Sequence, residues 1–454
     1  MLAIQDKQVL VLGLGDTGLS ALRWLRRQGA RLSVADSREA PPNLDRIQTE
    51  MPELVIYTGA FDESAFANQE LIVISPGVPL AEPEVQKAIQ RGIPVVGDVE
   101  LFAQHRPQSA KVIAITGSNG KSTVTTLVGE MCKTAGLNTV VAGNIGLPVL
   151  STLDGSEPDV YVLELSSFQL ETTSSLNADV ATVLNLSEDH LDRYDGMPGY
   201  AAAKARVFMG HGEQVLNRDD SWSMQMAIAG RHQHSFGLDH LQGQYGLKTD
   251  AGKTWLMDGD QPLIATSEMH IAGLHNAANA LASIALCRAI GIEMASLLTT
   301  LRNFKGLPHR VEWVADLAGV AYYDDSKGTN VGATCAALAG LVNPQSTQKV
   351  VLIAGGDGKG QDFSPLAEPV ARNARAVVLI GRDGPLIEQA LIATDVPMYR
   401  AEDMREAVVI SQRVAKPGDA VLLSPACASF DMFRNYLHRA EVFIAAVQQL
   451  EVAA

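Results

Sequence analysis

The 454-residue sequence predicts an α/β protein made of three α/β units. Short apolar runs alternate with helix-forming stretches along most of the chain, which is the pattern of parallel strands covered by helices. Glycine-rich turns follow apolar runs at the start of the first unit and of the second. At about 150 residues per domain the length fits three domains. We expect these domains at residues 1–99, 100–306 and 307–454.

The first domain is predicted to be Rossmann-like, with strands at residues 9–12, 32–35, 54–57, 71–74 and 93–96. The string Gly13-Leu14-Gly15-Asp16-Thr17-Gly18 follows the first strand, and Asp36 ends the second at the spacing of a ribose-binding acid. Taken alone, this suggests NAD. About a hundred residues are too few for both halves of a dinucleotide fold, so a phosphate or nucleotide-sugar ligand is preferred. A glycine turn that serves only helix packing stays open as an alternative.

The second domain begins with the string Gly117-Ser118-Asn119-Gly120-Lys121-Ser122, between an apolar run at 112–116 and a helix-like stretch. Glycines let the backbone wrap phosphate oxygens, and the helix start presents free N–H groups. Lys121 and Ser122 supply a cation and a hydroxyl that can face Mg²⁺. The first glycine of the usual P-loop string would fall on Ile115, so this is a shortened variant. We therefore predict a P-loop ATPase-like domain rather than an incidental glycine turn.

Polar residues follow the other expected strands of this domain, at 139–142, 160–165 and 180–184. Ligands of open α/β sheets bind beyond the carboxyl ends of the strands, so Asn144, Glu164 and His190 are predicted to meet the P-loop in one crevice. A carboxylate in the apolar run around Glu164 is costly to bury alone, which predicts a metal or lysine partner. His190 stands in a polar run, where a solvated loop histidine is the ordinary alternative.

The rest of the chain completes the second domain and forms the third. Residues 213–271 predict antiparallel additions to the central sheet, and a helix at 276–290 is expected to close the domain before a linker at 306–308. The third, Rossmann-like domain is predicted to have strands at 320–323, 350–354, 376–380 and 420–423.

Loops rich in glycine or hydroxyl groups follow three strands of the third domain, at 324–330, 355–360 and 424–429. Lys327 and Lys359 in these loops can neutralise carboxylates or phosphate, although exposed loop lysines are usually only solvated. Arg310, beside the linker, can reach a nucleotide when the domains approach.

Composition excludes several classes of protein. The formal net charge of -15 disfavours nucleic acid as a partner. Four cysteines without C-x-x-C spacing fit a reducing compartment. There is no run of about 18 apolar residues and no signal-peptide pattern. We expect a cytoplasmic protein without membrane insertion, and a monomer.

Six strings together resemble the Mur ligases of bacterial cell-wall synthesis, and within them the member that adds D-glutamate. They are Ala114 to Ser122, Glu164-Leu165-Ser166-Ser167, His275-Asn276-x-x-Asn279-Ala280, His309-Arg310, Asp325 to Asn330, and Ser424 to Phe433. The resemblance covers the whole chain. It implies that ATP, UDP-N-acetylmuramoyl-L-alanine and D-glutamate are converted to ADP, phosphate and the D-glutamyl amide through an acyl phosphate.

The resemblance also implies roles for individual residues. Lys121, Glu164, His190 and Lys204 would be catalytic, with Ser122, Glu164, His190 and a carbamylated Lys204 holding Mg²⁺. ATP would contact Gly117, Ser118, Asn119, Gly120, Lys121, Ser122, Thr123, Asn276, Arg310 and Asp325. The uridine nucleotide would contact Asp16, Thr17, Asp36, Ser37, Arg38 and Gly77, with Asn144 and Ser166 nearer its acyl end. D-glutamate would contact Lys327, Thr329, Lys359, Ser429 and Phe433, the last two largely through backbone N–H groups.

Three other functions stay open at this point. A related ligase could add a different amino acid, including L-glutamate on a pterin. A regulatory module could bind ATP as a signal without ligation. A dinucleotide oxidoreductase would use the first glycine turn.

Overall fold

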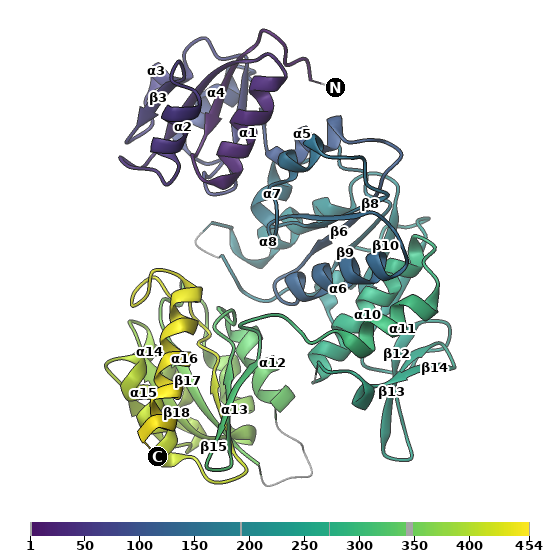
Figure 1. Ribbon diagram of the computed structural model, residues 1–454, viewed down its shortest axis with the longest axis vertical. Coiled ribbons are helices and arrows are strands. Elements are labelled where there is room, and N and C mark those ends of the chain that lie inside the picture. Colours follow the sequence, from purple (N-terminus) through teal and green to yellow (C-terminus); the bar gives the residue numbers. More distant parts are fainter. Residues whose placement is uncertain (1, 191–192, 272, 342–347, 454) are drawn as a thin grey trace.

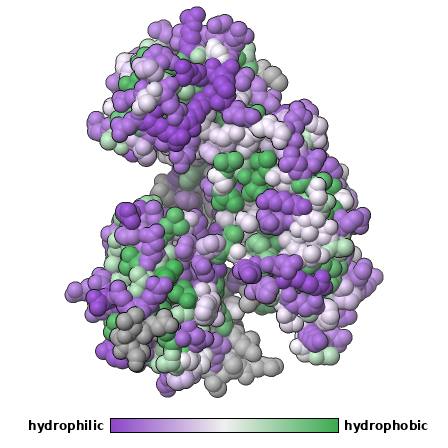
Figure 2. All heavy atoms as spheres, viewed as in Figure 1, coloured by the Kyte–Doolittle hydropathy of each residue, from purple (hydrophilic) through white to green (hydrophobic). Residues whose placement is uncertain are grey.

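The computed structural model describes residues 2–190, 193–271, 273–341 and 348–453. Its three sheets span residues 8–96, 111–265 and 312–423, which confirms the predicted α/β class. Figure 1 shows the first and third units on the same side of the central unit, and Figure 2 shows a hollow between them on the molecular surface. The predicted domain borders at 99 and 306 lie between the sheets and stay predictions. None of the described helices is long and apolar enough to cross a bilayer.

The first sheet is entirely parallel and has the order β3-β2-β1-β4-β5. The strands are β1 Gln8–Leu12, β2 Arg31–Asp36, β3 Val55–Thr58, β4 Leu71–Ile74 and β5 Val95–Val96. Between them lie α1 Asp16–Arg27, α2 Leu44–Glu50, α3 Glu63–Phe66 and α4 Pro83–Gln90. A Cβ on Gly18 would lie 1.8 Å from the Gly13 carbonyl oxygen, so the predicted glycine turn is needed for close packing of α1.

The second sheet has nine strands in the order β14-β13-β12-β11-β10-β9-β6-β8-β7. The strands are β6 Lys111–Thr116, β7 Thr139–Gly143, β8 Val160–Glu164, β9 Val180–Val183, β10 Glu213–Asn217, β11 Gln233–Phe236, β12 Tyr245–Asp250, β13 Lys253–Asp258 and β14 Gln261–Ala265. The helices are α5 Asp98–His105, α6 Lys121–Thr134, α7 Ser167–Glu171, α8 Gly196–Ala205, α9 Ser221–Gln225, α10 Leu274–Ala289 and α11 Met294–Asn303, with short 3-10 turns η1 Val149–Asp154, η2 Arg206–Phe208 and η3 Thr266–Glu268. The P-loop strand β6 lies between β9 and β8, at the centre of the parallel part.

Two predictions for this domain were wrong in part. The additions after residue 213 are antiparallel only in the β12–β13–β14 meander, because β10 and β11 continue the sheet in parallel. The turn-forming residues that separate the apolar runs of this stretch are also found in loops between short parallel strands. They therefore could not indicate whether the strands are parallel or antiparallel. The helix predicted to close the domain is followed by α11, which packs against α6 together with α10.

The third sheet has the order β15-β16-β20-β17-β18-β19. Its strands are β15 Glu312–Leu317, β16 Val320–Asp324, β17 Val350–Gly355, β18 Ala374–Ile380, β19 Met398–Arg400 and β20 Ala420–Leu423. The helices are α12 Val331–Leu341, α13 Ala367–Asn373, α14 Gly384–Leu391, α15 Met404–Val414 and α16 Tyr436–Ala453, with turns η4 Ser364–Leu366 and η5 Ile392–Thr394. The sequence prediction missed both edge strands. β15 pairs antiparallel with β16, and its mixed, half-exposed residues carry a weak strand signal.

Apolar clusters explain how the units are held together. One cluster combines Leu22 and Leu25 of α1 with Val149 and Leu150 of η1, so the first unit packs directly on the central one. Another fills the space between the central sheet and α6, α10 and α11. Two further clusters cover the two faces of the third sheet. The predicted polar residues lie at or just after the carboxyl ends of the strands, which is where ligands bind in such sheets.

Candidate active site

The P-loop joins the end of β6 to the start of α6, as predicted. Gly120 has φ +80°, and a Cβ at this position would lie 2.5 Å from Oδ1 of Asn279. Gly117 has φ +151°. Asn185, which the sequence analysis missed, accepts the Asn119 backbone N–H at 2.9 Å and donates from its side chain to the Asn119 carbonyl at 3.1 Å. The loop is therefore held open by a neighbouring strand end, with glycine where a side chain would collide.

Lys121 lies inside this loop. Its Nζ donates to the carbonyl oxygens of Gly117 and Ser118, both at 2.8 Å. Burial lowers its pKa from the ordinary value, while the carboxylates of Glu164 and Asp189 oppose that shift. The cation is thus placed where phosphate oxygens would enter a P-loop, and it can exchange two carbonyl partners for them.

Glu164 ends β8 and is 1% exposed. Its Oε1 accepts a hydrogen bond from Nδ2 of Asn144 at 2.7 Å, which brings together the ends of β7 and β8 as predicted. Its Oε2 is buried and has no hydrogen-bond partner among the described residues. A buried carboxylate oxygen without a partner is costly, and carboxylate and hydroxyl oxygens are the ligands that Mg²⁺ prefers. The residues at this point therefore fit a Mg²⁺ ion.

Ser122 is the P-loop hydroxyl that was predicted to bind this ion, and its side chain contacts the third domain. Its Oγ accepts a hydrogen bond from Nη2 of Arg310 at 2.9 Å. Asn330 also donates to Oδ1 of Asn119 at 3.0 Å. The third domain therefore already touches the P-loop, and Arg310 has to turn away if Ser122 is to face a metal.

His190 lies in the loop after β9 with φ +56°. Its ring packs edge-on against Phe168, with centroids 4.8 Å apart, and its Nε2 is 3.6 Å from Oδ2 of Asp189. Asp189 also accepts a hydrogen bond from Nζ of Lys359 at 3.3 Å. Asp189 was not predicted as a site residue. It links the central crevice to a loop of the third domain.

Lys204 of α8 is 2% exposed. Its Nζ donates to Oγ1 of Thr116 at 3.2 Å and lies 4.8 Å from the centre of the Tyr200 ring. Burial places the pKa of Lys204 well below its ordinary range, and the nearby charge of Lys121 lowers it further. This shift favours the neutral amine, which is the form that reacts with CO₂ to give a carbamate.

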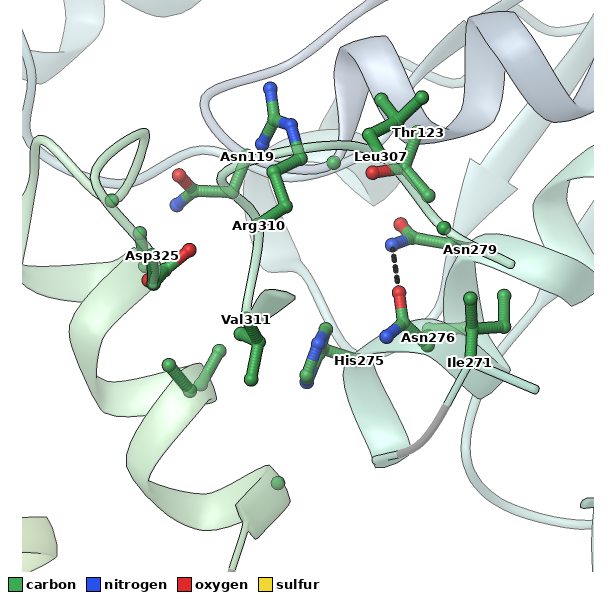
Figure 3. A pocket seen from close by; sticks show the side chains of 18 of the residues that line it. Asn119, Thr123, Ile271, His275, Asn276, Asn279, Leu307, Arg310, Val311 and Asp325 are labelled. Carbon is green, nitrogen blue, oxygen red and sulfur yellow. Dashed lines mark hydrogen bonds between the residues drawn. The ribbon is translucent and has the colours of Figure 1, made fainter. Parts of the chain in front are cut away.

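A cavity of about 950 Å³ lies between the central and third domains, beside the P-loop. Six of the predicted ATP contacts line it and so meet in one place: Asn119, Gly120, Thr123, Asn276, Arg310 and Asp325. In Figure 3, Asn276 and Asn279 from α10 face Asp325 and Val311 across this space, and Asn279 donates to Asn276 at 3.3 Å. Gly117, Ser118, Lys121 and Ser122 do not line the cavity. They lie at its P-loop end, which matches a nucleoside in the cavity and phosphates at the loop.

Asp325 is a buried acid, which is an unusual environment for a carboxyl group. It is 6% exposed, and its Oδ2 accepts a hydrogen bond from Oγ of Ser424 at 2.7 Å. Burial raises the pKa of Asp325 to about 7. Its carboxyl group can therefore accept a hydrogen bond from a ribose hydroxyl when it is ionised, or donate one when it is protonated.

The predicted amino-acid site centres on Lys327. Its Nζ lies 3.9 Å from the centre of the Tyr436 ring, and burial lowers the pKa of Lys327 to about 8. Tyr436, the first residue of α16, is outside the predicted set, and only the tertiary structure brings it to Lys327. Arg439, one turn further along α16, donates to the carbonyls of Ser326 at 2.8 Å and Cys427 at 3.1 Å. It holds two of the predicted binding loops together.

The other residues predicted for this site differ in their burial and in their contacts. Lys359 contacts Asp189, as described above, and Thr329 is half-buried in the loop after β16. Ser429 is buried, and its carbonyl accepts the backbone N–H of Phe433 at 2.8 Å. The Phe433 N–H is therefore used inside the loop, and a carboxylate can reach it only by replacing that bond. Ring position favours Tyr436 over Phe433 as the aromatic group beside Lys327.

The first domain gathers its predicted residues at the carboxyl ends of β1, β2 and β4. Asp36 accepts hydrogen bonds from the backbone N–H of Leu14 at 2.7 Å and from the Arg38 guanidinium at 2.7 and 2.8 Å. Ser37, Arg38, Gly77 and Asp16 are exposed, and Thr17 is half-buried. Asp16 begins α1, where its charge faces the positive helix end. A pyrophosphate at the same helix start would meet that charge.

Arg193 joins the first domain to the central crevice and was not predicted. Its guanidinium donates to the carbonyl of Pro76 at 2.8 Å and to Glu171 at 3.0 Å, and it stacks 4.0 Å from the centre of the Phe168 ring. The loop that carries Gly77 is thereby tied to the ring that packs against His190. Ser166 lies close by, where its side chain caps α7.

Comparison with known proteins finds matches to family models along most of the chain. Residues 7–97 match the family described as Mur ligase MurD-like, N-terminal domain, residues 115–287 the Mur ligase middle domain, and residues 309–427 the Mur ligase glutamate ligase domain. The chain belongs to the Mur ligase family. Within it, the chain is 64% identical over 453 residues to the UDP-N-acetylmuramoylalanine--D-glutamate ligase of Methylobacillus flagellatus, with 99% of each chain covered. It is 57% identical to the enzyme of the same name from Thiobacillus denitrificans, with 99% of this chain and 98% of the relative covered.

Solved structures show the same fold at low sequence identity. UDP-N-acetylmuramate-alanine ligase from Thermotoga maritima matches with a TM-score of 0.61 at 18% identity, covering 98% of this chain and all of the other. MurF from Acinetobacter baumannii matches with a TM-score of 0.63 at 18% identity, covering 98% and 91%. These likenesses confirm the three-domain architecture and carry no information on the substrate.

Proposed function

We propose that this protein is an ATP-dependent ligase that joins D-glutamate to UDP-N-acetylmuramoyl-L-alanine, in the cytoplasmic stage of peptidoglycan precursor synthesis. The observation that carries the proposal is the crevice in which three groups meet: a P-loop lysine, the buried Glu164 oxygen that has no hydrogen-bond partner among the described residues, and the buried amine of Lys204. The full-length similarity to D-glutamate ligases supports the choice of substrate.

The chemistry proceeds in two steps. The L-alanyl carboxylate attacks the γ-phosphorus of ATP, an O–P bond forms, and the bond to the β,γ-bridging oxygen breaks to release ADP. The amine of D-glutamate then attacks the acyl carbon, phosphate leaves, and the amine loses a proton to solvent or phosphate. Lys121 stabilises negative charge on the β- and γ-phosphates, and Arg310 can turn from Ser122 toward the same oxygens.

We propose that Mg²⁺ is held by Ser122, Glu164, His190 and a carbamate on Lys204. Such an ion neutralises phosphate charge and orients the attacking carboxylate. Carbamylation would turn a buried amine that donates a hydrogen bond to Thr116 into an anion beside the metal. This anion would also lie in the same crevice as the Lys121 ammonium.

The first and third domains are proposed to bind the two substrates of the ligation. The first-domain residues at the ends of β1, β2 and β4 are proposed to hold the uridine nucleotide, with Asn144 and Ser166 nearer the acyl end. Lys327 and Lys359 are proposed to bind the two carboxylates of D-glutamate, with Thr329, Ser429 and Phe433 nearby. The loops tied by Arg439 give this second site its shape.

Phosphate release from ATP tests the proposal directly. The purified protein is given UDP-N-acetylmuramoyl-L-alanine and, in parallel, D-glutamate, L-glutamate, L-lysine or meso-diaminopimelate. We expect release with D-glutamate alone. Release with another amino acid would keep the ligase mechanism and overturn the roles given to Lys327 and Thr329. Tight ATP binding with no release in any mixture would favour a regulatory module.

Substitution of Arg193 tests how the first substrate is positioned. We expect Arg193→Ala to raise the KM for the UDP substrate about tenfold or more while leaving the KM for ATP within about twofold, because it frees the Gly77 loop from the crevice. Arg27→Ala is the matched control, since Arg27 also bridges these domains, to Asp154, but through an exposed ion pair of little strength. Equal effects of the two substitutions, or a loss confined to kcat, would count against this positioning role.

A further inference from the structure

Two histidines and a glutamate lie together at the far end of the central sheet from the crevice. Glu213 is the first residue of β10, and His232 and His234 lie on either side of the first residue of β11. The parallel register places Val215 opposite His234. Because side chains on a strand alternate between faces, Glu213, His232 and His234 all project from the same face of the sheet.

Their polar atoms converge on one point. Nδ1 of His232 lies 2.9 Å and Nε2 of His234 lies 2.8 Å from the same oxygen, Oε2 of Glu213. The two imidazole rings stand nearly perpendicular, with centroids 4.7 Å apart. The three ligand atoms all lie within 4.8 Å of one another. This is the arrangement of a facial set of two imidazoles and one carboxylate.

The charge of the cluster favours a cation. The Glu213 carboxylate lies within hydrogen-bond distance of both imidazoles. The neighbouring Arg231 does not neutralise it, because its guanidinium donates to the carbonyls of Phe208, at 2.6 Å, and Gly210. The Glu213 carboxylate thus faces two imidazoles.

We propose that Glu213, His232 and His234 form a binding site for a divalent transition metal of the Zn²⁺ class. In such sites Zn–N distances are about 2.0–2.1 Å and Zn–O distances about 2.0–2.2 Å, which sets neighbouring ligand atoms roughly 3.3 Å apart. The two separations between imidazole nitrogen and carboxylate oxygen, 2.9 and 2.8 Å, need to grow by only about half an ångström to reach that spacing. His232 is 67% exposed, so it can make this movement, and water can fill the remaining coordination positions.

The proposed site is separate from the catalytic one in place and in chemistry. The crevice lies at the carboxyl ends of the parallel strands, whereas Glu213 and His232 lie at the amino ends of β10 and β11. Imidazole ligands suit Zn²⁺, Co²⁺, Ni²⁺ and Cu²⁺, while Mg²⁺ selects oxygen. A metal here would link two adjacent strands without taking part in ligation.

Direct binding measurements test this inference. The metal-free full-length protein is titrated with ZnCl₂ by calorimetry and with CoCl₂ by visible absorption, in excess Mg²⁺. We expect one ion per chain at the cluster, and a His232→Ala/His234→Ala double variant to bind that ion at least about 100-fold more weakly, since even groups that only support ligands change metal affinity 10- to 100-fold. Glu213→Gln, which preserves shape, is expected to weaken binding in the same direction.

Two controls show whether a loss of Zn²⁺ binding comes from this cluster, rather than from any exposed histidine or from misfolding. His240→Ala removes an imidazole that pairs with a single carboxylate, Asp260, and it should bind Zn²⁺ like the wild type. All variants should retain the basal ligase activity, which shows that they fold. The inference is overturned if the wild type takes up no Zn²⁺ in excess Mg²⁺, or if the double variant and Glu213→Gln bind it as the wild type does.

Discussion

Lys121→Ala is expected to lower the rate of ligation by about 10²- to 10³-fold or more, because a preorganised cation at a developing phosphate charge typically contributes this much. Lys121 lies within the loop, with its ammonium on the Gly117 and Ser118 carbonyls, so the substitution removes the charge without disturbing an apolar core. Phosphate release at saturating substrates measures the effect.

Lys133→Ala provides the matched control for this substitution. Lys133 lies on the same helix, α6, and forms an exposed ion pair with Glu130. Loss of an exposed pair has little effect on stability, so the variant should ligate at the wild-type rate. A Lys121→Ala enzyme that keeps more than about a tenth of the wild-type rate would remove the P-loop from the mechanism.

Lys204→Met should also cost about 10²- to 10³-fold in rate, because it removes the anion proposed to sit beside the metal. The native enzyme should lose activity in CO₂-depleted buffer and recover it on addition of bicarbonate, whereas the variant should respond to neither. Labelling with ¹³C-bicarbonate should give a carbamate resonance in the native protein that is missing from the variant.

The pH dependence of labelling follows from the direction of the pKa shift. An exposed lysine, with a pKa near 10.4, is protonated at pH 7 and reacts with CO₂ poorly until the pH approaches that value. Burial holds the pKa of Lys204 well below its ordinary range, so its reactive neutral form appears at lower pH than that of an exposed lysine. Labelling of Lys204 should therefore be half-complete at a lower pH than labelling of exposed lysines in the same protein. Labelling that rises together with that of the exposed lysines, or CO₂-independent activity, would rule out the carbamate.

Local patterns in the sequence identified the elements and much of the crevice. A P-loop is a continuous strand–turn–helix unit, so its glycines, lysine and serine could be recognised from spacing alone. Glu164 could be predicted because a lone acid in an apolar strand is costly to bury, and Asn144 because neighbouring parallel strands end at the same edge. The structure places these two residues 2.7 Å apart. The roles of Lys204, Asn276 and Asp325 came only from resemblance to a family, because a lysine in a helix carries no local sign of its surroundings.

The contacts between side chains that are distant in the sequence could be seen only in the tertiary structure. Periodicity cannot show whether β10 and β11 run parallel to the central strands, since direction depends on the path of the connecting chain. Nor can it show that Arg193 reaches the Gly77 loop, that Tyr436 lies beneath Lys327, or that Arg310 contacts Ser122 across 188 residues. The three α/β units and the phosphate-binding loop could be predicted from the sequence alone, because both depend on short-range patterns of residues. The buried oxygen of Glu164, the buried amine of Lys204 and the cluster of Glu213, His232 and His234 depend on burial and on contacts between strands, which exist only once the chain has folded.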